Sequence, residues 1–114
     1  MALDLKPLIW NWSPVASGDT YPAARITETL STEDLDRVTI TIRASGSTST
    51  AMLLDSNASG ITIATSTAGG WDFTIDAIPT SGLAAGVYSY QLETTTTLGT
   101  VRTEFSGTWE ILTY

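Results

Sequence analysis

The chain has 114 residues, a net charge of −7, and neither cysteine nor histidine. Residues 1–114 are expected to form one domain with its core at about residues 7–113, because a second domain would have too few residues for its own core. The absence of cysteine excludes disulfides and thiolate metal sites, and the absence of histidine removes the commonest general base. The five basic residues are scattered, which argues against nucleic-acid binding.

Alternation of apolar and polar residues predicts strands along the whole chain, with turn residues about every ten positions. The expected strands are, in chain order, residues 7–12, 20–28, 38–42, 51–54, 61–63, 71–76, 87–94 and 101–111. Pro22 means that the second strand begins late or lies at a sheet edge. Ser31 and Asp34 have the spacing of a helix cap, but the strand that follows limits any helix there to one turn. Residues 78–86 form a compact crossover with room for one tight helical turn.

The last two expected strands are the longest, and a short connection containing Gly99 joins them into an antiparallel hairpin. One side of the first strand carries Tyr88, Tyr90 and Leu92. In the second strand one parity is kept throughout by Val101, Thr103, Phe105, Gly107, Trp109 and Ile111, while Arg102, Glu104 and Glu110 point the other way. We expect this hairpin to be the central pair of an all-β, immunoglobulin-like antiparallel β-sandwich of about eight strands.

The start of the chain, residues 1–7, contains Asp4 and Lys6 and has no apolar run of signal-peptide length, so no secretory export is expected. No apolar run elsewhere in the sequence is long enough to span a bilayer. We therefore expect a protein that is soluble in the compartment where it is made and has no membrane partner.

Carboxylates supply the first candidate sites. The cluster Glu33, Asp34 and Asp36 could bind calcium, but it lacks the glycine and the terminal glutamate of an EF-hand loop, so a solvated turn is favoured. Two carboxylate pairs, Asp72 with Asp76 and Glu93 with Glu104, have the chemistry that glycoside hydrolysis needs. All four fall on the polar parity of their strands, which predicts ordinary exposed carboxylates without a raised pKa. We expect no enzymatic activity, no cofactor and no metal.

The four tryptophans, Trp10, Trp12, Trp71 and Trp109, all fall on the apolar parity of their strands. Aromatic residues in such positions most often fill the space between two sheets, and a platform for sugar rings is the alternative. Trp10 and Trp12 are the candidates for an interface or a glycan contact. Because Ile9 between them is also apolar, the first strand could be buried on both faces or packed against a partner.

Several stretches occur in an order typical of one family. They are an opening strand, Gly18-Asp19-Thr20, the alternating strand 38–42, Gly70-Trp71-Asp72-Phe73, the run 83–92, a turn, and the runs 99–103 and 106–111. From about Trp10 to Ile111 this order resembles the small immunoglobulin-like β-sandwich modules of tailed-bacteriophage virions, including those like the amino-terminal domain of baseplate upper proteins. Many such modules follow their second strand with Asp-Leu-Thr-Gly, where this chain has Asp34-Leu35-Asp36-Arg37, a departure that concerns the turn and not the sandwich.

The resemblance implies a non-enzymatic structural protein of a tailed phage or prophage virion, and it supplies no catalytic residues. Such a protein is made in the bacterial cytoplasm and assembles in multiple copies with itself and with other virion proteins. Edge strands that extend a neighbour's sheet would provide the contacts, with the strand at residues 7–12 as the first candidate. The alternative is a carbohydrate-binding or adhesin module that recognises a cell surface. The position in the virion, in the head, neck, tail or baseplate, stays open.

Overall fold

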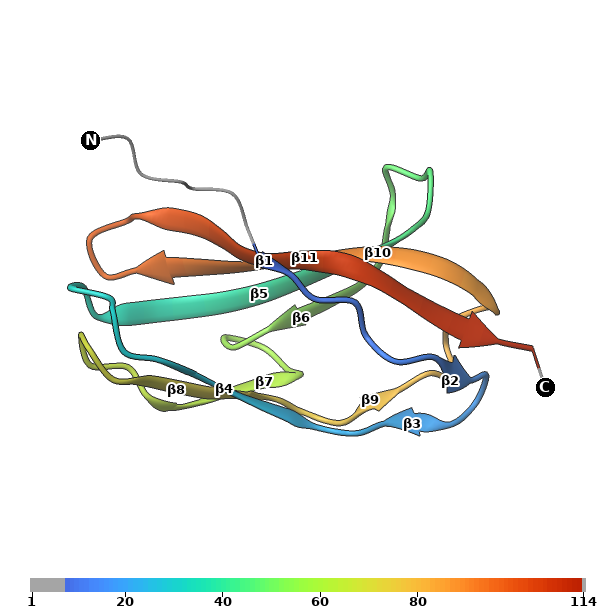
Figure 1. Ribbon diagram of the computed structural model, residues 1–114, viewed down its shortest axis with the longest axis horizontal. Coiled ribbons are helices and arrows are strands. Elements are labelled where there is room, and N and C mark those ends of the chain that lie inside the picture. Colours follow the sequence, from blue (N-terminus) through green and yellow to red (C-terminus); the bar gives the residue numbers. More distant parts are fainter. Residues whose placement is uncertain (1–7, 114) are drawn as a thin grey trace.

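This computed structural model describes residues 8–113, and that part of the chain contains eleven strands and no helix (Figure 1). The strands are β1 (Leu8–Ile9), β2 (Val15–Ala16), β3 (Thr20–Tyr21), β4 (Ala24–Glu28), β5 (Leu35–Ala44), β6 (Thr50–Asp55), β7 (Ile61–Thr65), β8 (Trp71–Ile75), β9 (Ile78–Pro79), β10 (Gly86–Thr96) and β11 (Val101–Leu112). With no helix in this range, no described segment is a helix that could cross a membrane.

The strands lie in two layers (Figure 1). A six-stranded sheet has the order β1-β11-β10-β5-β6, and β2 also pairs with β11. The facing layer holds the sheet β4-β8-β7 and the short pair β3-β9. The immunoglobulin-like all-β sandwich expected from the sequence is confirmed, with β10 and β11 at the centre of the larger sheet. Its antiparallel pairing has two exceptions, because β1 and β2 run parallel to β11.

The core forms between the layers from the apolar side of each alternating strand. In β5, Val38, Ile40 and Ile42 are fully buried, and Ile40 and Ile42 lie opposite Leu92 and Tyr90 of β10. The small sheet contributes a second buried row, which consists of Trp71, Phe73 and Ile75. The period of two therefore gives the correct inner face for both central strands of the sandwich.

The expected helical turns are absent from the described residues. At residues 31–34, the hydroxyl of Ser31 accepts a hydrogen bond from the Glu33 N–H, which makes a local turn. The Leu35 N–H then donates to Ser66 O, so the chain enters β5 at once. The crossover at residues 78–86 begins with the two-residue strand β9 and continues as a turn closed by a bond from Leu83 N–H to Thr80 O.

The strand expected at residues 20–28 is divided by Pro22 into β3 and β4, which pair with different strands. Proline lacks the N–H that a continuous ladder would need, so the division follows from its chemistry. β4 lies at the edge of its sheet, as expected for a strand next to a proline. Within β4, Ala24 and Ile26 face inward and Arg25 is exposed.

A β-bulge interrupts the hairpin between β10 and β11. Leu92 lies opposite Phe105, but the next residue, Glu93, lies opposite Thr103, so Glu104 is an extra residue on β11. Beyond this point Arg102 lies opposite Thr94, which is buried. The expectation that one parity persists from residue 101 to residue 111 is therefore wrong, because the bulge turns Arg102 and Glu104 toward the inner side of the sheet.

The strand expected at residues 7–12 begins as β1, and Pro7 lies outside the described residues. After Ile9 the chain still follows β11, because the Trp10 and Trp12 N–H groups donate to Ser106 O and Thr108 O, both at 2.9 Å. The chain passes so close to Gly107 that a Cβ there would lie 2.3 Å from Trp10 O. Glycine at position 107 is thus a condition for this parallel contact.

Candidate functional site

Trp12, one of the two tryptophans considered for ligand contact, is buried in a ring cluster. Its side chain is 5% exposed and stacks between Tyr90, at 4.3 Å between ring centroids, and Tyr21, at 5.8 Å. Trp109 packs against its edge at 5.3 Å and is fully buried. Because both faces of Trp12 are covered, its ring fills the core and has no open face for a sugar.

Trp10 is half-buried and lies at the rim of the same cluster. It meets Trp12 and Phe105 edge to face, at 5.8 and 5.6 Å between centroids, and its carbonyl accepts a hydrogen bond from the Tyr90 hydroxyl at 2.5 Å. Burial raises the pKa of Tyr90, so this hydroxyl stays protonated and keeps donating. Of the two candidates, Trp10 is the one that a partner could reach.

The three carboxylates of the acidic cluster, Glu33, Asp34 and Asp36, do not converge on one point. Glu33 accepts hydrogen bonds from the hydroxyls of Thr96 and Thr100, at 2.6 and 2.9 Å, and these bonds lower the pKa of Glu33. Asp34 accepts from the Ala68 N–H at 2.8 Å, and Asp36 is exposed on β5. Within residues 8–113, no three acidic, histidine or cysteine side chains are grouped so that they could hold a metal ion.

In each of the two carboxylate pairs considered for hydrolysis, the two members have different partners or lie on different sides of the sheet. Asp72 accepts two hydrogen bonds from Arg25, at 2.9 and 2.6 Å, which lower the pKa of Asp72. Asp76 instead accepts from the hydroxyl of Thr62 at 3.1 Å. The other pair is separated by the bulge, because Glu93 stays on the outer side of the large sheet whereas Glu104 turns inward.

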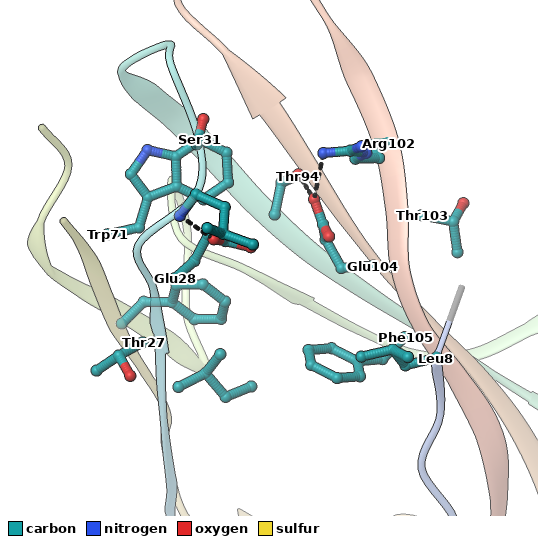
Figure 2. A pocket seen from close by; sticks show the side chains of 13 residues that line it. Leu8, Thr27, Glu28, Ser31, Trp71, Thr94, Arg102, Thr103, Glu104 and Phe105 are labelled. Atoms are coloured by element: carbon teal, nitrogen blue, oxygen red, sulfur yellow. Dashed lines mark hydrogen bonds and ion pairs between the residues drawn. The ribbon is translucent and has the colours of Figure 1, made fainter. Parts of the chain in front are cut away.

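A cleft of about 440 Å³ opens between the two layers, next to the end of the β10–β11 hairpin (Figure 2). Ile26 and Phe73 of the small sheet form one apolar wall, and Leu8 and Phe105 of the large sheet form the other. The exposed side chain of Leu30 also lines it. A second hollow of about 680 Å³ shares Leu30, Trp71 and Arg102 with this cleft and continues past Thr96 and Thr100.

Charged side chains enter the cleft from both layers. Figure 2 shows Glu28 of β4 and Glu104 of β11 directed into the space between the layers. The Thr94 hydroxyl donates to Glu104 Oε1 at 3.1 Å, and Arg102 Nη1 lies 4.0 Å from the same oxygen. Glu28 accepts from the Leu30 N–H. These bonds fix both carboxylates in place beside apolar walls.

The cleft was not predicted from the sequence, because strict alternation places Glu104 and Arg102 on the outer side of the sheet and the bulge turns both to the inner side. One signal was present. Thr94 and Thr96 continue the parity of Tyr88, Tyr90 and Leu92, and both threonines are buried. Buried hydroxyl groups need hydrogen-bond partners. A row of inward residues that changes from apolar side chains to threonines therefore indicates that other polar side chains lie on the inner side of the sheet. Glu104 and Glu33 are those partners.

The chain matches no protein-family profile, and no curated protein matches it at a significant level. One solved structure is similar in fold. It is a family 123 glycoside hydrolase from Clostridium perfringens, described for glycolipid glycan hydrolysis, and it is 17% identical to this chain with a TM-score of 0.54. The match covers 94% of this chain but only 23% of that enzyme chain. At this identity the similarity shows a shared fold alone.

Proposed function

We propose that the chain is a non-enzymatic structural module of a tailed-phage or prophage virion, which assembles in multiple copies with itself and with other virion proteins. The observation that carries the proposal is the uncovered edge of the large sheet. At this edge Leu8 and Ile9 of β1 are 67% and 72% exposed, and no described strand pairs with β1 on the side away from β11. The sequence resemblance to virion modules points the same way.

The β1 edge has backbone groups that a neighbouring strand can use. Successive N–H groups of an extended chain point to opposite sides. Since the Trp10 and Trp12 N–H groups bond to β11, the N–H of Ile9 points away from the sheet. Proteins usually protect such edges with charges or prolines, so exposed leucine and isoleucine favour strand addition by a partner.

The opposite edge, β6, has similar properties. It ends the sheet next to β5 and exposes Leu53, which is 52% accessible. A module with an open strand at each edge of one sheet can contact two neighbours. In a symmetric particle, many weak contacts of this kind add up to stable attachment. The module would be made in the host cytoplasm and would act in the virion.

The test uses particles banded from the strain that carries the gene. Mass spectrometry of these particles is expected to find the chain at a fixed ratio to the other virion proteins. Ile9→Pro removes the outward N–H and is expected to reduce incorporation while the fold is kept, whereas Ile9→Thr retains that N–H and serves as the matched control. Particles that lack the chain, or equal incorporation of Ile9→Pro and wild type, would refute the proposal.

A carbohydrate-binding or adhesin module is the second candidate, and the polar groups of the cleft between the layers are the observation in its favour. Carboxylates, a guanidinium and hydroxyls can all bind sugar hydroxyls, and Glu28, Glu104, Arg102 and Thr94 place these groups together. Glycolipid glycans, the compounds that the similar glycoside hydrolase acts on, are the first to test. A glycan array would compare wild type with Trp10→Ala and Glu104→Gln. Specific binding lost in either folded variant would favour this candidate over the virion role.

A further inference from the structure

The two strands that border the cleft each have an unpaired edge. β4 ends its sheet, and no described strand pairs with it on the side away from β8. On β11, the pairing of β1 begins at Phe105, so within the described residues Val101 to Thr103 pair only with β10 and Glu104 is the extra residue of the bulge. An extended segment that entered the cleft would find backbone donors and acceptors on both sides.

The mouth of the cleft is apolar. Leu8 and Leu30 are 67% and 86% exposed beside it, and exposed large apolar residues around a hollow mark an interaction surface. The one tryptophan that lines the cleft, Trp71, offers a sugar no open indole face, because it is 3% exposed and its indole N–H is already bonded to Glu33 O at 2.9 Å. These properties favour an occupant with apolar side chains over a saccharide.

The charge of the cleft is negative. Glu28 and Glu104 are opposed by Arg102 alone, and Glu33 adds a further carboxylate in the adjoining hollow. Arg102 Nη1 approaches Glu104 only to 4.0 Å, so a closer cation can still pair with that carboxylate. A second copy of this chain is a poor occupant of the cleft, because its five basic residues are scattered and no segment of it carries closely spaced basic side chains.

We propose that this cleft binds an extended segment of a partner protein in which basic residues alternate with apolar ones. The segment adds a strand beside β4 or residues 101–104, its apolar side chains lie between Leu8, Leu30 and Phe105, and its basic side chains pair with Glu28 and Glu104. The inference rests on the proposed role in assembly and names one contact within it.

The probe is a synthetic peptide of alternating valine and lysine, and the control peptide alternates valine and glutamate. Binding to the full chain is followed through the backbone amide shifts in a two-dimensional NMR titration. We expect the lysine peptide to shift the amides of β4 and of residues 101–104, and to bind more weakly as salt is raised. Glu28→Gln and Glu104→Gln should each weaken binding about 2- to 5-fold, and the double variant about 10-fold.

Glu93→Gln is the matched control, because it removes the same charge from the outer side of the same hairpin. An equal loss of affinity in this variant, or equal binding of the glutamate peptide, would reduce the effect to net charge and overturn the proposal. Shifts that map to β1 or β6, an oligosaccharide that occupies the cleft in place of the peptide, or no saturable binding would also overturn it. Incorporation into particles without peptide binding would leave the proposed function intact and refute the cleft contact alone.

Discussion

Gly107→Ala tests whether the parallel contact between the first segment and β11 sets the stability of the sandwich. A Cβ at position 107 would lie 2.3 Å from Trp10 O, 2.8 Å from Trp10 C and 2.9 Å from Asn11 Oδ1. The first two are backbone atoms, so no side-chain rotation relieves the overlap. The backbone at Trp10 must move away by about 1 Å to reach van der Waals contact.

That displacement has a cost that the structure allows us to work out. It lengthens the bonds from the Trp10 and Trp12 N–H groups to β11, each of which contributes about 1 kcal/mol. Forcing a methyl group into a packed site costs about 1–3 kcal/mol more. Alanine recovers about 0.5–1 kcal/mol because it loses less backbone entropy on folding than glycine. The net loss in free energy of unfolding is therefore about 2–4 kcal/mol.

Urea unfolding followed by tryptophan fluorescence measures this loss, and an unchanged slope with denaturant would assign it to stability. In a thermal scan the same loss lowers the Tm by roughly 10–30 °C. Gly82→Ala is the control, since its Cβ would meet nothing within 4 Å, and it should change stability by less than about 0.5 kcal/mol. If Gly107→Ala were as stable as Gly82→Ala, the close contact with Trp10 would not exist in solution.

Four further variants test the core and its ionisable groups. Trp12→Ala should cost about 3–5 kcal/mol and unfold much of the protein, whereas Trp10→Ala, at a half-buried ring, should cost less; equal urea midpoints would refute the ring cluster. Hydrogen bonds from Arg37 lower the pKa of Asp55 below its usual 3.8, so its contribution is present above that pH and disappears in acid. Asp55→Asn should lose about 1–3 kcal/mol at neutral pH and flatten the acid limb of the stability curve; an unchanged limb would contradict this. Burial raises the pKa of Tyr90 above its usual 10.0, so stability should fall above that pH as the unfolded chain loses this proton, and Tyr90→Phe should reduce the fall in alkaline urea titrations.

The sequence allowed the prediction of those parts of the fold that depend on local burial. The expected strand 38–42 lies within β5, and the expected strand 87–94 lies within β10. In both strands the period of two arises because one face packs against the other layer. Whether a residue is apolar or polar shows which face it lies on, and this can be read without knowing which strand it pairs with. The burial of Trp71 and Trp109 follows from the same rule.

The pairing of β1 and β2 with β11 could not be predicted in this way. A two-residue strand carries too few positions for a period, and its partner lies about a hundred residues further along the chain. The cleft was hidden for a similar reason. It depends on Glu28 and Glu104 lining one space from two different layers, and on a change of register that is set by the geometry of the whole hairpin.

The extra residue at Glu104 also controls what the end of the hairpin offers to its surroundings. If that position were deleted, the ladder would continue in step, with Thr103 still opposite Glu93 and Arg102 still opposite the buried Thr94. The opening would lose the Glu104 carboxylate and keep the Arg102 guanidinium, whose charge balances that of Glu28. The loss of a single codon at this point would thus bring the net charge of the cleft from negative to zero, while the paired strands kept their register.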